Sequence, residues 1–90
     1  MKLIVQFDLT NADLAAFETY EAAVLPLLAE HGGVLEQRLR AVDDAGETHV
    51  ISFPSREAFE AYVADPRRLI QAAAYTASRA KTAYWEVRDV

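Results

Sequence analysis

Cysteine is absent from the 90 residues of this sequence, which excludes disulfide bonds, a thiol nucleophile and a thiolate metal site. Because small secreted domains usually depend on disulfides, we expect this chain to work in the reducing cytoplasm. Basic residues are also scarce, nine against fourteen acidic ones, and the net charge is −5. Nucleic acid and anionic membranes, which need a basic patch, are therefore not expected as partners.

Long apolar runs are missing as well. The first residues offer only the run Leu3 to Val5, much less than the apolar core of a signal peptide. No stretch approaches the roughly 18 apolar residues that span a bilayer. The length fits a single domain, residues 1–90, because a second hydrophobic core would need a longer chain.

Alternation of apolar and polar residues predicts four strands, at Lys2 to Leu9, Val34 to Val42, Glu47 to Phe53 and Lys81 to Val90. The turn residues of Asp43 to Gly46 predict a hairpin between the second and third strands.

Apolar residues three and four apart predict helices in the two remaining intervals. The first helix is expected from about Ala12 to His31, with Thr10 or Asn11 as its cap and a kink or break at Pro26. Glycine favours the left-handed conformation of a helix end, so the pair after His31 is expected to terminate this helix.

The second interval is expected to hold a short helix capped by Ser55 and a longer one that begins at Asp65 and runs to Arg79. Arg67 and Arg68 are expected to lie in solvent at its start. The element order is then that of a ferredoxin-like βαββ(αα)β sandwich, an α+β fold whose four-stranded antiparallel sheet carries its helices on one side.

Alternation also assigns each strand residue to a face of the sheet. The expected helix-facing set is Leu3, Val5, Phe7, Leu35, Leu39, Ile51, Phe53, Trp85 and Val87. The expected open face carries Ile4, Gln6, Asp8, Val34, Glu36, Arg38, Arg40, Val42, Val50, Ser52, Tyr84 and Glu86. Because a solvated face would be almost entirely polar, this mixture predicts that a second copy of the sheet covers it in a homodimer.

Two segments resemble a known superfamily. They are YEAAVLPLLAEHGG, from Tyr20 to Gly33, and HVISFPSREAFEAYVADPR, from His49 to Arg67. A helix with an internal proline that ends in a glycine pair, and a strand that runs into Phe-Pro-Ser before a helix, resemble the dimeric α+β barrel superfamily. The likeness is greatest to its small uncharacterised bacterial members and its NIPSNAP-like branch, and extends over essentially the whole chain.

The resemblance implies a barrel formed by two paired sheets. Some members, the antibiotic-biosynthesis monooxygenases, oxidise polycyclic aromatic substrates without metal or flavin, whereas others are isomerases, haem-degrading enzymes, chlorite dismutases or domains of no known activity. Asn11 is expected as a helix cap and Trp85 in the last strand, so the residue pair of the haem-degrading branch is not matched. The resemblance thus supports fold and dimer more than chemistry, and no cofactor is expected.

Four residues of the expected open face form the best candidate ligand site: Gln6, Asp8, Arg38 and Tyr84. A buried carboxylate beside a guanidinium serves as a base or as an anchor for a ligand. The alternative interpretation is that the charged residues of this face form ion pairs across the dimer interface, namely Glu36, Arg38, Arg40 and Glu86.

The two histidines, His31 and His49, are far apart in the sequence. His31 is expected to cap the end of the first helix, with a role as acid or base at a cavity rim as the alternative. His49 is expected to be a hydrogen-bonded structural residue. No short ligand spacing is present, so no metal site is assigned.

These features favour a homodimeric module that binds a small, partly apolar molecule in a cavity on the open sheet face. Two alternatives stay open. One is a cofactor-independent monooxygenase or isomerase that acts on a phenolic or enolisable substrate, and the other is a structural or interaction domain without a ligand. The sequence identifies no reaction.

Overall fold

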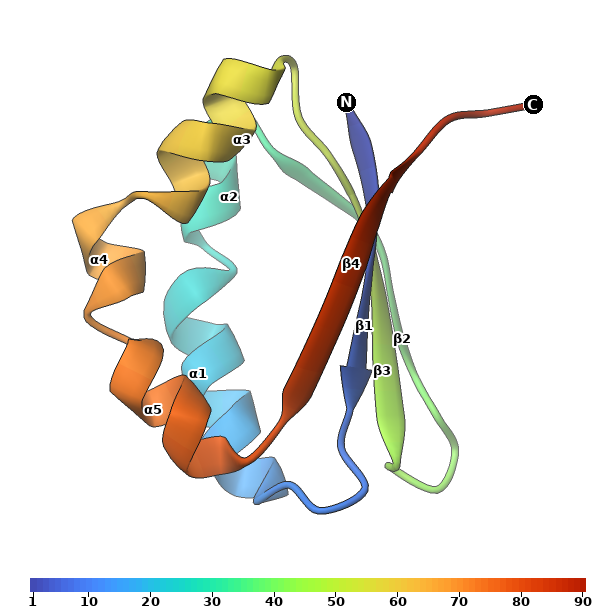
Figure 1. Ribbon diagram of the computed structural model, residues 1–90, viewed down its shortest axis with the longest axis vertical. Helices are drawn as coiled ribbons and strands as arrows, with labels where there is room; N and C mark the ends of the chain where they lie inside the picture. The colour runs from blue at the N-terminus through green and yellow to red at the C-terminus, as the bar shows by residue number, and fades with distance from the viewer.

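A computed structural model describes residues 1–90 and shows two layers, an antiparallel sheet and a layer of helices that covers one of its faces (Figure 1). The strands are β1 (Lys2–Asp8), β2 (Val34–Arg40), β3 (Gly46–Ser52) and β4 (Lys81–Val87), in the order β2-β3-β1-β4. The helices are α1 (Leu14–Val24), α2 (Leu27–Glu30), α3 (Arg56–Val63), α4 (Pro66–Leu69) and α5 (Ala72–Ser78). This arrangement confirms the predicted α+β, ferredoxin-like fold.

Short polar side chains cap the N-termini of three helices. Ser55 accepts a hydrogen bond from the backbone of α3, and Asp65 does the same for α4, as predicted. The predicted cap of α1 was wrong. Asp13, rather than Thr10 or Asn11, accepts from the backbone N–H of Ala16 at 3.0 Å.

Proline and glycine divide the first helical interval as the sequence indicated. The helix breaks around Pro26, so that α1 ends at Val24 and α2 begins at Leu27. Gly32 then adopts a φ of +73°, and a Cβ on Gly33 would lie 2.8 Å from the Phe53 ring. Only glycine fits both requirements at this helix end.

The predicted continuous helix from Asp65 to Arg79 was wrong. It is divided into α4 and α5, and the helical backbone is interrupted between Leu69 and Ala72. Leu69 and Ile70, which lie at this interruption, are 58% and 75% exposed.

A β-bulge in β2 reverses the predicted faces of that strand from Gln37 onward. Leu35 lies opposite Ile51, but the next paired residue, Gln37, lies opposite Val50, so one extra residue is accommodated at this point. The predictions for Arg38, Arg40 and Leu39 were therefore wrong: Arg38 and Arg40 lie on the helix side, opposite buried residues of β3, and Leu39 lies on the open face.

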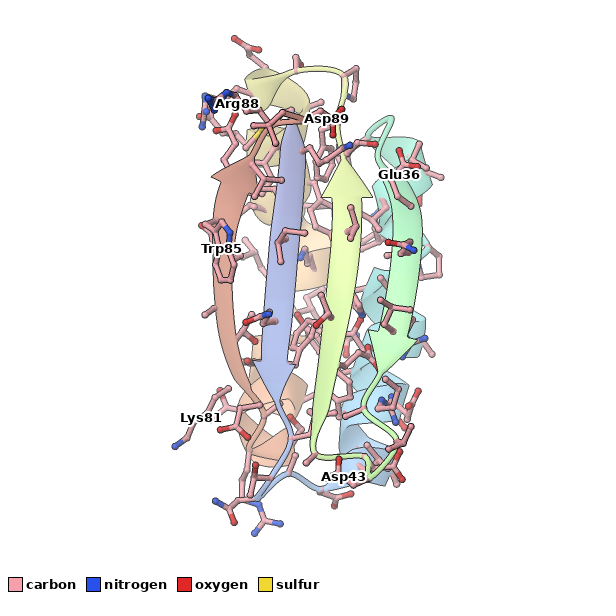
Figure 2. All side chains as sticks on the ribbon, turned by 90° about the vertical axis from the view of Figure 1, so that its right-hand side faces the viewer. Glu36, Asp43, Lys81, Trp85, Arg88 and Asp89 are labelled. Atoms are coloured by element: carbon pink, nitrogen blue, oxygen red, sulfur yellow. The ribbon has the colours of Figure 1, made fainter.

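The faces of β4 are also the reverse of the prediction. Tyr84 pairs with Val5 on the helix side, whereas Trp85 pairs with Ile4 on the open face (Figure 2). The cause lies before the strand, where Arg79 takes a left-handed conformation and Ala80 is buried. Alternation from an inward Ala80 turns Tyr84 and Glu86 toward the helices and Trp85 and Val87 away from them.

The core between the two layers consists of two separate clusters. The larger contains Leu3, Leu27, Leu28, Ile51, Phe53 and Tyr62, and the smaller contains Leu9, Phe17 and Ala80. Their separation leaves room for a pocket between sheet and helices. None of the helices has both the length and the apolar character needed to cross a membrane.

Candidate functional site

The inter-layer pocket lies between the helix-facing side of the sheet and helices α1, α3, α4 and α5, and has a volume of about 380 Å³. Its floor is formed by β1, β3 and β4, and most of its lining is apolar or aromatic. Leu3, Ile51, Phe53 and Tyr62 of the larger core cluster contribute to the lining, as do Phe7 and Tyr75, which pack against the smaller one. The divided core therefore creates this pocket.

Several aromatic rings border the pocket and pack against one another. Tyr20 and Tyr75 have ring centroids 5.1 Å apart, and Phe59 lies 6.2 Å from Tyr84. Burial raises the pKa of Tyr20 and of Tyr62, so both phenols keep their protons near neutral pH. Protonated phenols are hydrogen-bond donors for a ligand in the pocket.

A buried ion-pair network adjoins one wall of the pocket and is centred on Glu47. One carboxylate oxygen of Glu47 accepts from Arg40 Nε at 2.7 Å, and the other accepts from Arg38 Nε at 3.0 Å and lies 2.6 Å from His49 Nε2. Both arginines also bond to Glu18 of α1. The network thus ties β2 and β3 to the helical layer.

The network determines the protonation of its members. Burial pushes the pKa of Glu47 upward, but the hydrogen bonds from His49, Arg40 and Arg38 together outweigh it and leave the pKa below its ordinary value. Burial lowers the pKa of His49, against the attraction of Glu47. At neutral pH Glu47 is therefore ionised and His49 is neutral.

Glu21 of α1 is the second carboxyl at this wall and lies in a different environment. It lines the pocket and is only 2% exposed, and its side chain takes part in none of the hydrogen bonds or ion pairs of the structure. Burial, and then the negative charge of Glu47, raise its pKa to about 7. Glu21 is thus a proton donor or acceptor poised at neutral pH.

Ligand atoms of Glu21, Glu47 and His49 all lie within 4.8 Å of one another, which is close enough to hold a metal ion. However, each oxygen of Glu47 already accepts a hydrogen bond from an arginine. A divalent cation bound through either oxygen would have to compete with a guanidinium group, so we assign no metal to this cluster.

Arg68 of α4 is the one arginine that lines the pocket. Its guanidinium lies over the Tyr62 ring, 4.8 Å from the centroid, and its Nε is buried without a hydrogen-bond partner. Unlike Arg67, which bonds to Asp65 and Glu30, Arg68 belongs to no ion pair. The prediction that Arg68 is solvated was wrong, because α4 turns this side chain toward the pocket.

The four residues predicted to bind a ligand do not share one face. Arg38 and Tyr84 lie on the helix side, and of these Tyr84 lines the inter-layer pocket. Gln6 and Asp8 lie on the open face, beside a shallow depression of about 600 Å³. The side chain of Thr10, and then its backbone N–H, which donates to Asp8, lower the pKa of the Asp8 carboxyl. A role of these four residues in ligand binding stays a prediction.

Glu36, Arg40 and Glu86 were expected to form ion pairs across an interface, and all three have partners within the chain. Glu36 accepts from Ser52, Arg40 bonds to Glu47, and Glu86 pairs with Arg56.

The histidines also have partners within the chain. His49 is the buried, hydrogen-bonded residue that was predicted. His31 ends α2 and its backbone N–H bonds to Leu28, but its ring lies 2.8 Å from Asp65, the cap of α4. Hydrogen bonds from Arg67 and His31 hold the pKa of Asp65 well below its usual range. This cluster joins α2 to α4 and lies outside the pocket.

Comparison with known proteins gives matches among solved structures alone. No family model and no curated protein matches the chain. SnoaB, a cofactor-independent oxygenase from Streptomyces nogalater, is similar over 99% of this chain and 93% of its own, with a TM-score of 0.75 and 24% identity. A putative antibiotic biosynthesis monooxygenase from Caulobacter crescentus gives a TM-score of 0.74 at 13% identity, over 98% of this chain and 89% of its own.

A NIPSNAP domain protein from Burkholderia xenovorans gives a TM-score of 0.65 at 9% identity, with 98% of this chain and 95% of that one covered. The chain has the fold of the dimeric α+β barrel superfamily. Since these identities are low, the similarity to members of this superfamily shows the fold and leaves the chemistry to the residues of the pocket.

The sequence analysis missed two functional candidates, Glu21 and Arg68, and only Glu21 carried a weak signal. Glu21 lies near the apolar stripe of its helix, between Phe17 and Val24, where a carboxylate is unexpected. Arg68 follows a helix start, a position at which charged residues are usually solvated, so no pattern distinguished it.

Replacement of Glu21 by Gln is expected to change the pH dependence of stability. Because the pKa of Glu21 is raised from 4.5 to about 7, the folded protein holds more protons than the unfolded chain between these values. The contribution of Glu21 to the free energy of unfolding therefore falls by about 3 kcal/mol as the pH rises through this range, and stays constant above it.

Glu21→Gln, which resembles the protonated form, is expected to lose this decline and to be more stable than wild type at about pH 8. Urea denaturation across the pH range measures both effects. Glu57→Gln, an exposed substitution with the same charge change, is expected to follow wild type. A decline of equal size in Glu21→Gln would contradict the assignment.

Proposed function

We propose that this chain binds a small, largely apolar molecule in the inter-layer pocket. The observation that carries the proposal is the coexistence of an apolar lining with two unpaired ionisable side chains, Glu21 and Arg68. Ligand sites commonly combine these features, because the apolar walls supply affinity and a few polar groups fix orientation. The proposed cavity is on the helix side, rather than on the open face that the sequence suggested.

The rings that border the pocket favour a flat ligand. Aromatic side chains pack well against the face or edge of another ring, and here they come from both the helical layer and the sheet. A structural domain without a ligand would be expected to fill this space with its own side chains, as close-packed interiors do.

Blocking the pocket is expected to abolish binding of the neutral naphthalene dye prodan. Ala72 and Ala74 are both exposed residues of α5, but only Ala72 lines the pocket. Ala72→Trp is expected to weaken binding at least tenfold because the indole occupies the space of the dye, and Ala74→Trp is expected to bind as wild type does. Dye fluorescence measures the affinities. Equal binding by all three proteins would place the dye elsewhere.

A second candidate function is cofactor-independent oxygenation, or isomerisation, of an enolisable substrate. Glu21 favours it, because a carboxyl with a pKa of about 7 inside an apolar pocket is suited to remove a proton from carbon or from a phenol. SnoaB, described as a cofactor-independent oxygenase, has the same fold. The arrangement provides a base and a nearby cation, Arg68, for the resulting anion.

The stoichiometry of such an oxygenation needs no external reductant. The methylene group of a hydroxyanthrone loses two hydrogens and gains one atom of O₂ as a ketone oxygen, while the second atom leaves as water. The electrons that reduce O₂ come from the substrate itself. The protein would have to generate and stabilise the enolate and exclude bulk water.

The oxygenase candidate predicts O₂ consumption with dithranol, a hydroxyanthrone, above the rate without protein. Glu21→Gln is expected to lower the protein-dependent rate roughly a hundredfold, the usual range for loss of a general base. Glu57→Gln serves as the control. An oxygen electrode measures the rates. A wild-type rate equal to the background would remove this candidate, and an unchanged rate in Glu21→Gln would remove Glu21 from the reaction.

The open sheet face is the proposed dimer interface. No helix covers it, and each of the four strands places a large apolar side chain on it: Ile4, Leu39, Val50 and Trp85, of which Leu39 is 54% and Trp85 is 48% exposed. Pairing with a second copy across a two-fold axis would remove this surface from water.

The cytoplasmic location inferred from the absence of cysteine is part of the same proposal.

Light scattering at micromolar concentration is expected to give the mass of two chains for wild type. Trp85→Glu is expected to give a monomer, because burial of a carboxylate in the proposed interface carries a desolvation penalty of several kcal/mol. Ile70→Glu places the same charge on the helical layer, where Ile70 is 75% exposed, and is expected to leave the dimer intact. A monomeric wild type, or a dimeric Trp85→Glu, would exclude this interface.

A further inference from the structure

Arg68 has a charge without a counter-ion. A guanidinium stays protonated at every physiological pH, so it needs either water or an anion as partner. The Nε of Arg68 is buried and unbonded, and none of the ion pairs of the structure includes this residue. Its guanidinium lies over the Tyr62 ring, 4.8 Å from the centroid, and no carboxylate is paired with it. The pocket therefore offers one unpaired positive charge.

Glu21 shares the pocket with Arg68 and is also unpaired. Around these two side chains, the guanidinium groups of Arg38, Arg40 and Arg68 are matched by the carboxylates of Glu18, Glu47 and Glu21. Charge is balanced when Glu21 is ionised. One further anion in the pocket would upset this balance, and protonation of Glu21 would restore it.

We propose that the natural ligand of the inter-layer pocket carries a single carboxylate that pairs with Arg68, and that Glu21 takes up one proton from solvent when the ligand binds. The proposal rests on the proposed binding function and names the chemical class of its ligand: a compact, mostly aromatic or apolar carboxylic acid. The neutral Glu21 carboxyl then donates a hydrogen bond instead of repelling the ligand.

Charge favours a monoanion over other ligands. A cationic group would lie beside Arg68, whose charge has no carboxylate partner, and a phosphate would bring nearly two negative charges to one unpaired guanidinium. A carboxylate also matches the planar fork of arginine, with two parallel hydrogen bonds from one guanidinium. A neutral ligand would leave Arg68 without a counter-ion.

The charged and titratable groups around Glu21 are known from every neighbouring element. They are Glu18 and Tyr20 on α1, Arg38 on β2, Glu47 and His49 on β3, Tyr62 on α3, Arg68 on α4 and Tyr75 on α5. Glu47 is fixed in its ionised form by two arginines, and burial keeps His49 neutral. Glu21 is thus the group of this set that changes charge near pH 7.

The test compares 2-naphthoate with 2-naphthamide, which have nearly the same shape and differ in charge. Calorimetry in two buffers of different ionisation enthalpy gives the affinity and the protons taken up. Naphthoate is expected to bind more tightly than the amide, and to take up about 0.9 proton at about pH 8 and about 0.1 at about pH 6. Its affinity for the protein is expected to fall about tenfold as the pH rises from about 6 to about 8.

Two variants separate the roles of the residues. Glu21→Gln is expected to bind naphthoate with no proton uptake and with the same affinity at both pH values. Arg68→Gln is expected to lose the preference for naphthoate over naphthamide. Glu57→Gln and Arg88→Gln, both exposed, repeat the charge changes and are expected to behave as wild type does. Circular dichroism confirms the fold of each variant.

Each result has a distinct meaning. Tight binding of naphthamide with weaker binding of naphthoate would overturn the proposed ligand class and leave the pocket as a binding site for neutral molecules. Naphthoate binding without proton uptake would remove Glu21 from the proposal. Failure of both probes and of prodan to bind would overturn the binding function itself.

Discussion

The buried carboxylate of Glu47 and the two arginines that hold it are the constraint on which the site depends. A carboxylate that is 4% exposed would be strongly destabilising without partners. Arg38 and Arg40 reach it only because the bulge in β2 turns them from the open face to the helix side. The one inserted residue therefore turns both counter-charges toward the interior. It also leaves Leu39 on the open face, the surface proposed to bind a second chain.

The unusual state of Glu21 follows from this arrangement. Both arginines are already bonded to Glu47 and Glu18, so neither of them is free to pair directly with the carboxyl of Glu21. Burial and the charge of Glu47 then raise the pKa of Glu21 to about 7. The stable ion-pair network and the reactive carboxyl are thus two consequences of the same distribution of charge. A structural role for Glu47 and a functional role for Glu21 are compatible.

The sequence was sufficient to predict the fold and insufficient to predict the site. Alternation, the proline in the first helix and the glycine pair determine the order and approximate bounds of the elements, because these signals depend on local backbone preferences. The faces of β2 and β4 depend instead on a bulge and on a left-handed residue, Arg79. A shift of one residue exchanges the faces, so Arg38 and Tyr84 were expected on the wrong side. Glu21 and Arg68 become candidates only when three-dimensional packing shows that they lack partners.

The two proposed activities of the pocket use the same distribution of charge. An enolisable substrate that gives its proton to Glu21 becomes an anion beside Arg68, and a carboxylic acid that binds with proton uptake reaches the same state, with a neutral Glu21 and a ligand anion. A pocket that stabilises a bound carboxylate is thereby complementary to the enolate of a deprotonated substrate. Carboxylate affinity and proton abstraction should accordingly decline together when Arg68 is replaced, because both depend on the single guanidinium that the fold leaves without a partner.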